Sequence, residues 1–212
     1  MIYAYTGTPG SGKSYSATLR AYELIHRPRP KMVVANYNLV LDSKHQRYFR
    51  YLPNDELSLE NLREISNEYF STHDFTESAI TLIVDEAQLV FNSRTWNDKN
   101  RLSLLEFFSQ SRHMGYDVIL VAQSDQMIDK QFRALVEYEV KHRKLANFGL
   151  VGRLLSLLAF GRVYAAVTYY YGLKERIAVR FFVPRKKIFR LYDSYVMFRR
   201  TDDGRAVEPE PA

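Results

Sequence analysis

Short apolar runs alternate with longer segments of helical spacing along the first two thirds of the chain. In the longer segments apolar residues recur every three or four positions, as Ala17, Ala21, Leu24 and Ile25 do, which is the spacing of one helix face. The shorter runs are rich in branched and aromatic residues, as buried strands are. The pattern predicts strands over residues 2–6, 32–36, 79–84, 117–122 and 136–141, and helices over residues 15–26, 57–70, 102–114 and 127–135.

This alternation predicts an α/β fold, with a mostly parallel sheet flanked by helices on both faces. Right-handed crossovers bring the carboxyl ends of such strands to one edge of the sheet, and ligands bind outside that edge. Residues that follow a predicted strand are therefore the first candidates for a site.

The pattern changes after residue 148. Val151, Leu154, Leu155 and Leu158 have the spacing of an amphipathic helix. Two β-rich runs then predict a hairpin, and an aromatic segment predicts a final strand. The hairpin covers residues 163–171 and 176–183, and the final segment covers residues 187–198. We expect a core domain over residues 1–145, a C-terminal extension of the same domain over 146–198, and a disordered tail or linker over 199–212.

Composition narrows the functional classes. The 212 residues are 46% hydrophobic, as in globular proteins, and include no cysteine. This excludes a disulfide scaffold, a thiolate zinc site and a cysteine nucleophile, and it suits a reducing compartment. The apolar stretch nearest to a membrane span, residues 148–172, is interrupted by Arg153 and Arg162. The first predicted strand begins at the initiator methionine, so we expect no signal peptide.

Charge is unevenly distributed. Residues 1–140 carry 15 Lys and Arg against 18 Asp and Glu, whereas residues 141–212 carry 15 against 6. The last third is therefore strongly basic and suits an anionic surface, either phospholipid headgroups or a nucleic-acid backbone. A solvated basic face without a partner is the alternative.

The loop after the first strand, GTPGSGKS, matches the phosphate-binding pattern G-x-x-x-x-G-K-[ST]. Its glycines let successive backbone N–H groups point at phosphate oxygens, and the next helix adds its positive N-terminal end. Lys13 is expected to contact the β and γ phosphates, and the Ser14 hydroxyl is expected to ligate Mg²⁺. The expected nucleotide-binding residues are Gly7, Thr8, Pro9, Gly10, Ser11, Gly12, Lys13, Ser14 and Tyr15.

Two further strands end in polar residues. The apolar run 81–84 is followed by Asp85, expected to hold Mg²⁺, and Glu86, expected to activate the attacking water. Gln123 follows the run 118–122 and is a candidate sensor of the γ-phosphate if that strand lies between the first strand and the Asp85 strand. Lys13, Glu86 and Gln123 are thus the candidate catalytic residues. The alternative for Gln123 is an ordinary surface position.

An additional cation commonly assists phosphoryl transfer. We expect Arg94, Arg101 and Arg133 toward the functional edge and Arg112 at the opposite edge, where a neighbouring subunit's nucleotide is the remaining possibility. Structural ion pairs are the alternative role. The guanine-reading motif Asn-Lys-x-Asp is absent, which favours adenine nucleotides.

Several segments together resemble the cytoplasmic domain of zonular occludens toxin-like proteins, the assembly ATPases of filamentous phages. They are the nucleotide motifs of residues 1–14 and 82–88, Ser111-Arg-His-Met-Gly-Tyr-Asp117, the segment from Gln123 to Arg133, and Phe189-Arg-Leu-Tyr-Asp-Ser-Tyr195. The resemblance extends over about residues 1–198.

The resemblance implies an ATP- and Mg²⁺-dependent ATPase that helps to export single-stranded phage DNA during virion assembly. It implies the cytoplasmic face of the bacterial inner membrane, a homo-oligomeric ring, of which a hexamer is one form, and coat, assembly and envelope channel proteins as partners. The family domain is normally followed by a membrane span, which this chain lacks, so residues 201–212 are expected to begin the linker. A ring-forming DNA translocase and a non-catalytic, nucleotide-responsive scaffold remain alternatives. Nothing in the residues supports a toxin role.

Overall fold

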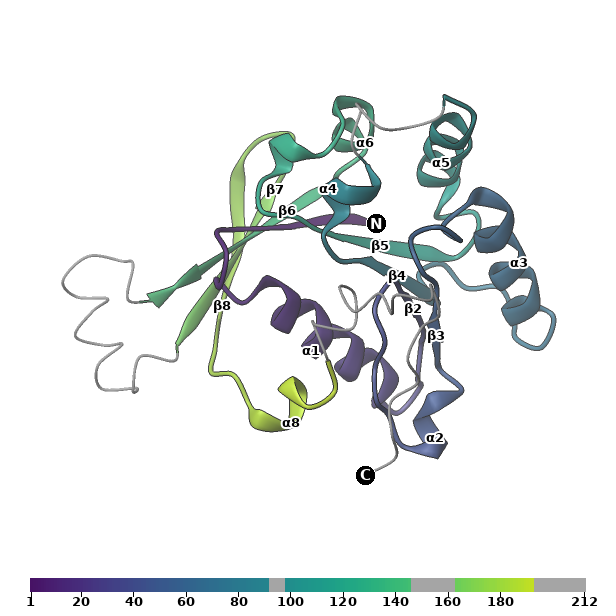
Figure 1. Ribbon diagram of the computed structural model, residues 1–212, viewed down its shortest axis with the longest axis horizontal. Coiled ribbons are helices and arrows are strands. Elements are labelled where there is room, and N and C mark those ends of the chain that lie inside the picture. The colour runs from purple at the N-terminus through teal and green to yellow at the C-terminus, as the bar shows by residue number, and fades with distance from the viewer. Residues whose placement is uncertain (92–97, 146–162, 193–212) are drawn as a thin grey trace, which may run out of the picture.

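A computed structural model describes residues 1–91, 98–145 and 163–192 (Figure 1). The helix predicted around Val151 to Leu158 and the tail predicted over residues 199–212 lie outside the described residues. Among the helices that the structure describes, none is both long and apolar enough to cross a membrane.

Eight strands form one sheet in the order β3-β2-β4-β5-β1-β6-β7-β8. Five of the seven strand pairings are parallel, and the two pairings that add β7 and β8 are antiparallel. The mostly parallel α/β fold is therefore confirmed. The strands are β1 (Ile2–Thr6), β2 (Met32–Ala35), β3 (Phe49–Tyr51), β4 (Ile80–Val84), β5 (Tyr116–Val121), β6 (Tyr138–Lys144), β7 (Tyr164–Tyr170) and β8 (Glu175–Phe182).

Several helices begin where the local sequence supplies a side-chain cap. The Ser58 hydroxyl accepts a hydrogen bond from the Asn61 N–H, and the Asp129 carboxylate accepts one from the Gln131 N–H. The helices are α1 (Lys13–Ile25), α2 (Ser43–Gln46), α3 (Leu59–Phe70), α4 (Ala87–Val90), α5 (Asp98–Gln110), the 3₁₀ helix η1 (Asp125–Met127), α6 (Lys130–Ala134) and α8 (Lys186–Phe189).

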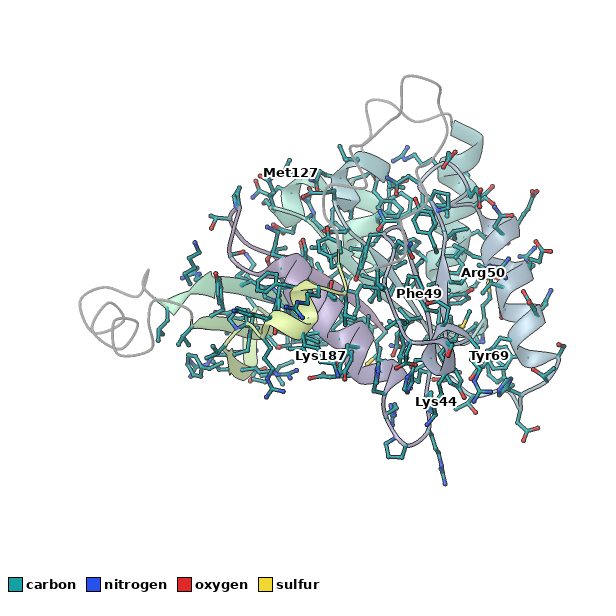
Figure 2. The ribbon with its side chains drawn as sticks, turned by 60° about the horizontal axis from the view of Figure 1, so that its bottom comes forward. Lys44, Phe49, Arg50, Tyr69, Met127 and Lys187 are labelled. Atoms are coloured by element: carbon teal, nitrogen blue, oxygen red, sulfur yellow. The ribbon has the colours of Figure 1, made fainter. Side chains whose placement is uncertain are left out.

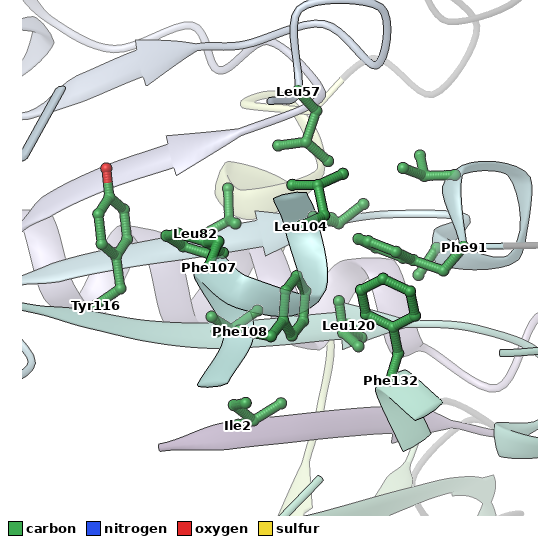
Figure 3. Close-up of a cluster of buried hydrophobic side chains, with 14 of the residues drawn as sticks. Ile2, Leu57, Leu82, Phe91, Leu104, Phe107, Phe108, Tyr116, Leu120 and Phe132 are labelled. Carbon is green, nitrogen blue, oxygen red and sulfur yellow. The ribbon is translucent and has the colours of Figure 1, made fainter. Parts of the chain in front are cut away.

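Helices cover both faces of the sheet, as predicted (Figure 1). On one face α3, α5 and α6 bury an apolar cluster in which Phe107, Phe108 and Phe132 pack beside Leu82 and Leu120 (Figure 3). On the other face α1 packs its small and branched side chains against β2, β4 and β5. Burial on both faces explains why the central strands are apolar at nearly every position.

The predicted hairpin is confirmed, because β7 and β8 pair antiparallel around the turn that contains Gly172. It extends the sheet through β6 instead of forming a separate layer.

Three details differ from the prediction. In the described part of residues 187–198, helix α8 stands where a strand was expected, and Tyr192 makes an isolated bridge to Leu39. The helix predicted over residues 127–135 is divided into η1 and α6, because Asp129 caps a new helix. The short elements α2 and β3 were not predicted, since four and three residues are too few to show a period.

Candidate active site

The loop between β1 and α1 is held in a conformation that requires glycine. Gly7 has φ 145°, and a Cβ there would lie 2.4 Å from the carbonyl oxygen of His142 on β6. Gly12 has φ 89°, and a Cβ there would lie 3.1 Å from the ring of Tyr164 on β7. The loop is therefore packed directly against the extended part of the sheet, and larger residues do not fit at these two positions.

Backbone hydrogen bonds fix the shape of the loop. The Gly7 N–H donates to the carbonyl of Gln123 at 3.2 Å, and the Ser11 N–H donates to the carbonyl of Thr8 at 3.1 Å. Gly12 precedes α1 and supplies no side-chain cap. The N-terminal N–H groups of this 13-residue helix therefore remain available to an anion.

Lys13 is the cation of the loop. Its side chain is 8% exposed, and its ammonium group donates to the Thr8 carbonyl at 3.2 Å. Burial lowers the pKa of Lys13, while the nearby carboxylates of Glu86 and Asp85 act to raise it. A buried ammonium group that faces two carboxylates across a cavity is a suitable partner for phosphate oxygens.

Asp85 lies at the carboxyl end of β4 and is 1% exposed. Asn36, at the end of the neighbouring strand β2, clamps its backbone. The Asn36 amide donates to the Asp85 carbonyl at 2.8 Å and accepts from the Asp85 N–H at 2.7 Å. The side chain accepts a hydrogen bond from Tyr192 at 2.9 Å and lies close to the Ser14 hydroxyl. Burial raises the pKa of Asp85, and the two neighbouring hydroxyl groups oppose that rise.

Glu86 follows in an unusual backbone conformation. Its φ of 48° lies in the left-handed region, which ends β4 sharply and lets the residue precede α4. The Gln88 amide donates to its carboxylate. The bend separates the two acidic side chains, so Asp85 is buried beside Ser14 while Glu86 lines the cavity.

Gln123 lies where a sensor of the γ-phosphate is expected. Strand β5 lies between β4 and β1 in the sheet, and Gln123 comes two residues after its end. Its side chain lines the same cavity as Lys13 and Glu86. Whether Gln123 senses the γ-phosphate remains a prediction.

These residues enclose one cavity of about 430 Å³ at the carboxyl ends of the central strands. Residues of the loop form one side, and Glu86 and Gln123 lie opposite. Thr18 of α1 and five residues of the C-terminal extension complete the wall. The latter are Tyr164, Pro184, Ile188, Phe189 and Tyr192.

The C-terminal extension is fastened to α1 beside this cavity. The Tyr15 ring stacks on Phe182 at 5.7 Å, and its hydroxyl accepts from the Arg185 N–H at 2.9 Å. Lys187 on α8 reaches the Tyr22 hydroxyl at 2.7 Å (Figure 2). Tyr15 therefore lines the cavity as part of an aromatic wall.

The structure brings the sequence-predicted residues of the site together and adds several that were not predicted. Asn36, Tyr164 and Ile188 carry no local motif, and only the chain topology brings them to the site. Phe189 and Tyr192 had a signal, since both belong to the segment Phe189 to Tyr195 that supports the family resemblance.

The arginines fall as expected where the structure describes them. Arg101 pairs with Asp129 at 3.1 Å, near the edge where β5 ends. Arg112 pairs with Glu137 at 2.5 Å, at the edge where β5 and β6 begin. Arg94 lies outside the described residues. The ion pairs of Arg101 and Arg112 are consistent with structural roles.

The donor set fits a hard divalent cation. Ser14 and Asp85 offer a hydroxyl and a carboxylate oxygen close together, and Mg²⁺ prefers oxygen ligands. The adjoining loop supplies backbone N–H groups and Lys13 for the phosphates that usually complete such a coordination shell.

Comparison with known proteins adds to this picture. The family described as zonular occludens toxin (Zot) matches residues 1–198. The gene 1 protein of Enterobacteria phage I2-2 is 37% identical over 76% of this chain and 46% of its own length. The gene 1 protein of Enterobacteria phage M13 is 28% identical over 96% of this chain and 62% of its own length. The chain thus spans about half the length of the curated relatives that it matches.

Two kinds of solved structure share the fold. The N-terminal domain of zonular occludens toxin from Neisseria meningitidis aligns with a TM-score of 0.53 at 19% identity, over 91% of this chain and 98% of that one. The genome packaging NTPase B204 from Sulfolobus turreted icosahedral virus 2, solved in complex with ATP-gammaS, aligns with a TM-score of 0.52 at 15% identity, over 87% of this chain and 97% of that one. The chain therefore has the fold of P-loop NTPases.

Proposed function

The chain belongs to the zonular occludens toxin family, and on that premise we propose that it is an ATPase that binds Mg²⁺-ATP and hydrolyses it to ADP and phosphate. One observation carries the proposal. The glycine loop, the buried Asp85, and Glu86 line or adjoin a single cavity, although they come from segments about 70 residues apart. Neither a glycine turn nor an acidic strand end would by itself require this convergence.

Each residue has a role that follows from its position. The backbone of residues 7–13 and the Lys13 ammonium group bind the phosphates, while Ser14 and Asp85 hold Mg²⁺, which neutralises phosphate charge. Glu86 lines the cavity and orients a water toward the γ-phosphate. Gln123 donates a hydrogen bond to that water or to the phosphate. The aromatic wall made by Tyr15 and the C-terminal extension is the place for the base.

Substitution of Glu86 tests hydrolysis separately from binding. Glu86→Gln keeps the side-chain shape but removes the proton acceptor, so turnover should fall by about 10²- to 10⁴-fold. Binding of ATP should persist, because Glu86 does not form the loop. The measurement is phosphate release at increasing protein concentration, with Glu64→Gln, on the exposed surface of α3, as the control. Wild-type turnover in Glu86→Gln would contradict the assignment.

We further propose that this ATPase powers filamentous phage assembly, exporting single-stranded phage DNA at the cytoplasmic face of the inner membrane. This proposal is supported by the sequence relationship of the chain to the gene 1 proteins of Enterobacteria phages I2-2 and M13. Coat and assembly proteins and an envelope channel are the partners that this role requires. Phosphate release that rises more than linearly with protein concentration would support a ring, and strictly linear release would contradict it.

A groove beside the site favours DNA as a second ligand. It is lined by Arg133, Lys141, Arg143 and Lys174, with Asp125 and Glu139 as the acidic members. Its tyrosines are already engaged, since Tyr171 donates to Asp125 at 2.7 Å and Lys141 lies 5.5 Å above the Tyr169 ring. The groove therefore suits the phosphate backbone better than stacked bases.

Salt dependence tests this second ligand. Affinity for single-stranded DNA that falls steeply between 50 and 200 mM salt would support a translocase, because released counterions drive such binding. Absence of binding at low salt would contradict DNA binding by this domain and would not affect the ATPase assignment.

A further inference from the structure

Tyr192 places its hydroxyl among the residues assigned to the metal. It donates to the Asp85 carboxylate at 2.9 Å, and the Ser14 hydroxyl lies close to it. It reaches this position from the C-terminal extension, 107 residues away from Asp85 in the sequence. Neither phosphate-binding motif contains it.

The backbone and the ring of Tyr192 are anchored independently of the hydroxyl. The residue pairs with Leu39 in an antiparallel bridge, and the Val40 N–H donates to the Leu191 carbonyl at 3.1 Å. The ring packs edge-to-face on Tyr37, with 4.9 Å between centroids. Backbone pairing and ring packing thus hold the residue, so its hydroxyl is free to act on Asp85.

The hydrogen bonds leave the Asp85 carboxylate little freedom. One oxygen accepts the Glu86 N–H at 2.9 Å, and the other accepts the Tyr192 hydroxyl. Asn36 holds the backbone of the same residue. Three residues thus hold Asp85 in place, and Tyr192 is the one that the C-terminal extension supplies.

We propose that Tyr192 is a positioning residue of the metal site, which orients Asp85 and Ser14 so that their oxygens are directed at Mg²⁺ when Mg²⁺-ATP binds. The inference rests on the proposed function. It assigns to the C-terminal extension an indirect part in metal binding, through Asp85, beyond closing the wall of the cavity. Outer partners of this kind commonly change metal affinity by about 10- to 100-fold when they are removed.

The test is the substitution Tyr192→Phe, which removes the hydroxyl and retains the ring. Affinity for ATP is measured by calorimetry in Mg²⁺ and in EDTA. In Mg²⁺ the variant should bind ATP at least about 10-fold more weakly than wild type. In EDTA the two proteins should bind equally, because the loop and Lys13 are unchanged. Direct titration with Mn²⁺ in the presence of ATP, read by electron paramagnetic resonance, should show the same loss.

Tyr37→Phe is the matched control. It removes the hydroxyl of the ring against which Tyr192 packs, and among the described residues that hydroxyl makes no hydrogen bond. This control should bind ATP as wild type does in both conditions. Thermal melting of both variants establishes that they are folded.

Two results would overturn the inference. Binding of Mg²⁺-ATP by Tyr192→Phe as tight as that of wild type would show that the hydroxyl only secures the chain. Alternatively, equal losses in Mg²⁺ and in EDTA would show that Tyr192 shapes the pocket and does not act on the metal. Failure of the wild-type protein to bind ATP at all would instead refute the proposed function, so the two failures are distinguishable.

Discussion

At the scale of single residues, the site depends on side chains and backbone conformations that are rare in an unfolded chain and that the fold enforces. Lys13 and Asp85 are buried ionisable groups. Burial lowers the pKa of Lys13 and raises the pKa of Asp85, which favours the neutral form of each. Glu86 adopts a left-handed backbone conformation that a non-glycine residue rarely adopts. Such features cost folding free energy and are expected at functional sites, where ligand binding makes use of them.

Gly7 provides a stability test at this scale. In Gly7→Ala the new Cβ would meet the His142 carbonyl oxygen at 2.4 Å, and the φ of 145° is strained for alanine. We expect the free energy of unfolding to fall by about 1–3 kcal/mol, with weaker ATP binding. The control is Gly172→Ala in the hairpin turn, where the nearest atom, on the Tyr170 ring, would lie 3.6 Å away. Urea unfolding measures both, and equal stabilities would contradict this description of the loop.

The motif residues were predictable because their chemistry is local. The loop of residues 7–14 and the acidic pair after β4 carry their own pattern, and the structure brings them to one cavity. Asn36 and Tyr192 were not predictable in the same way. Their roles arise from contacts with Asp85 across 49 and 107 residues, and a single sequence does not display such contacts.

At the scale of elements, β6 and the hairpin support the phosphate-binding loop. His142 on β6 is buried, with Tyr5 and Phe182 as ring neighbours and its carbonyl oxygen against Gly7. Burial lowers the pKa of His142 to about 4, so the folded protein holds it neutral. The strand thus places an uncharged imidazole beside the loop that we propose to bind phosphates.

This burial predicts a dependence of stability on pH. The unfolded chain takes up a proton at His142 near pH 6.5, whereas the folded protein does so only near pH 4. The contribution of His142 is therefore constant above about pH 6.5 and becomes increasingly destabilising as the pH falls toward 4. We expect a loss of about 1 kcal/mol between pH 7 and pH 5.5 from this residue.

The variant His142→Leu should lack this part of the loss, as measured by urea unfolding at the two pH values. His73→Gln is the control, because His73 is exposed on the turn after α3 and should leave the loss unchanged. A loss in His142→Leu as large as in wild type would show that His142 is not the responsible group.

The central strands and their helices were predictable. The strands are compact apolar runs of four to six residues, and helices of 12 or 13 residues are long enough to show the helical spacing of apolar residues. The elements α2, β3 and α8 were not, since each has only three or four residues and forms through contacts with distant parts of the chain. For example, α8 lies beside α1 through the contact between Lys187 and Tyr22.

At the scale of the whole molecule, the two halves of the chain meet at the cavity. The parallel part of the sheet supplies the phosphate-binding loop and the acidic pair, and the antiparallel part with α8 supplies the aromatic wall and Tyr192. The ion pair between Arg180 on β8 and Glu23 on α1, at 2.5 Å, adds to this connection. A nucleotide in the cavity would touch both parts, so its binding should stabilise the whole domain.

Thermal stability measures this coupling. Saturation with Mg²⁺-ATP at 100 times its dissociation constant should stabilise the folded protein by about 2.7 kcal/mol. Melting monitored by circular dichroism should therefore shift upward as one cooperative transition. A shift confined to part of a biphasic transition would contradict the view that the extension belongs to the same domain.

The most direct measurement of the central claim is calorimetric titration of the wild-type protein and of Lys13→Ala with ATP in the presence of Mg²⁺. We predict one ATP per chain for the wild type, and an affinity at least about 10-fold weaker for Lys13→Ala, because a charged hydrogen bond to phosphate is lost. Absence of binding to the folded wild-type protein, or equal affinity in the two proteins, would contradict the assignment of this cavity to a nucleoside triphosphate.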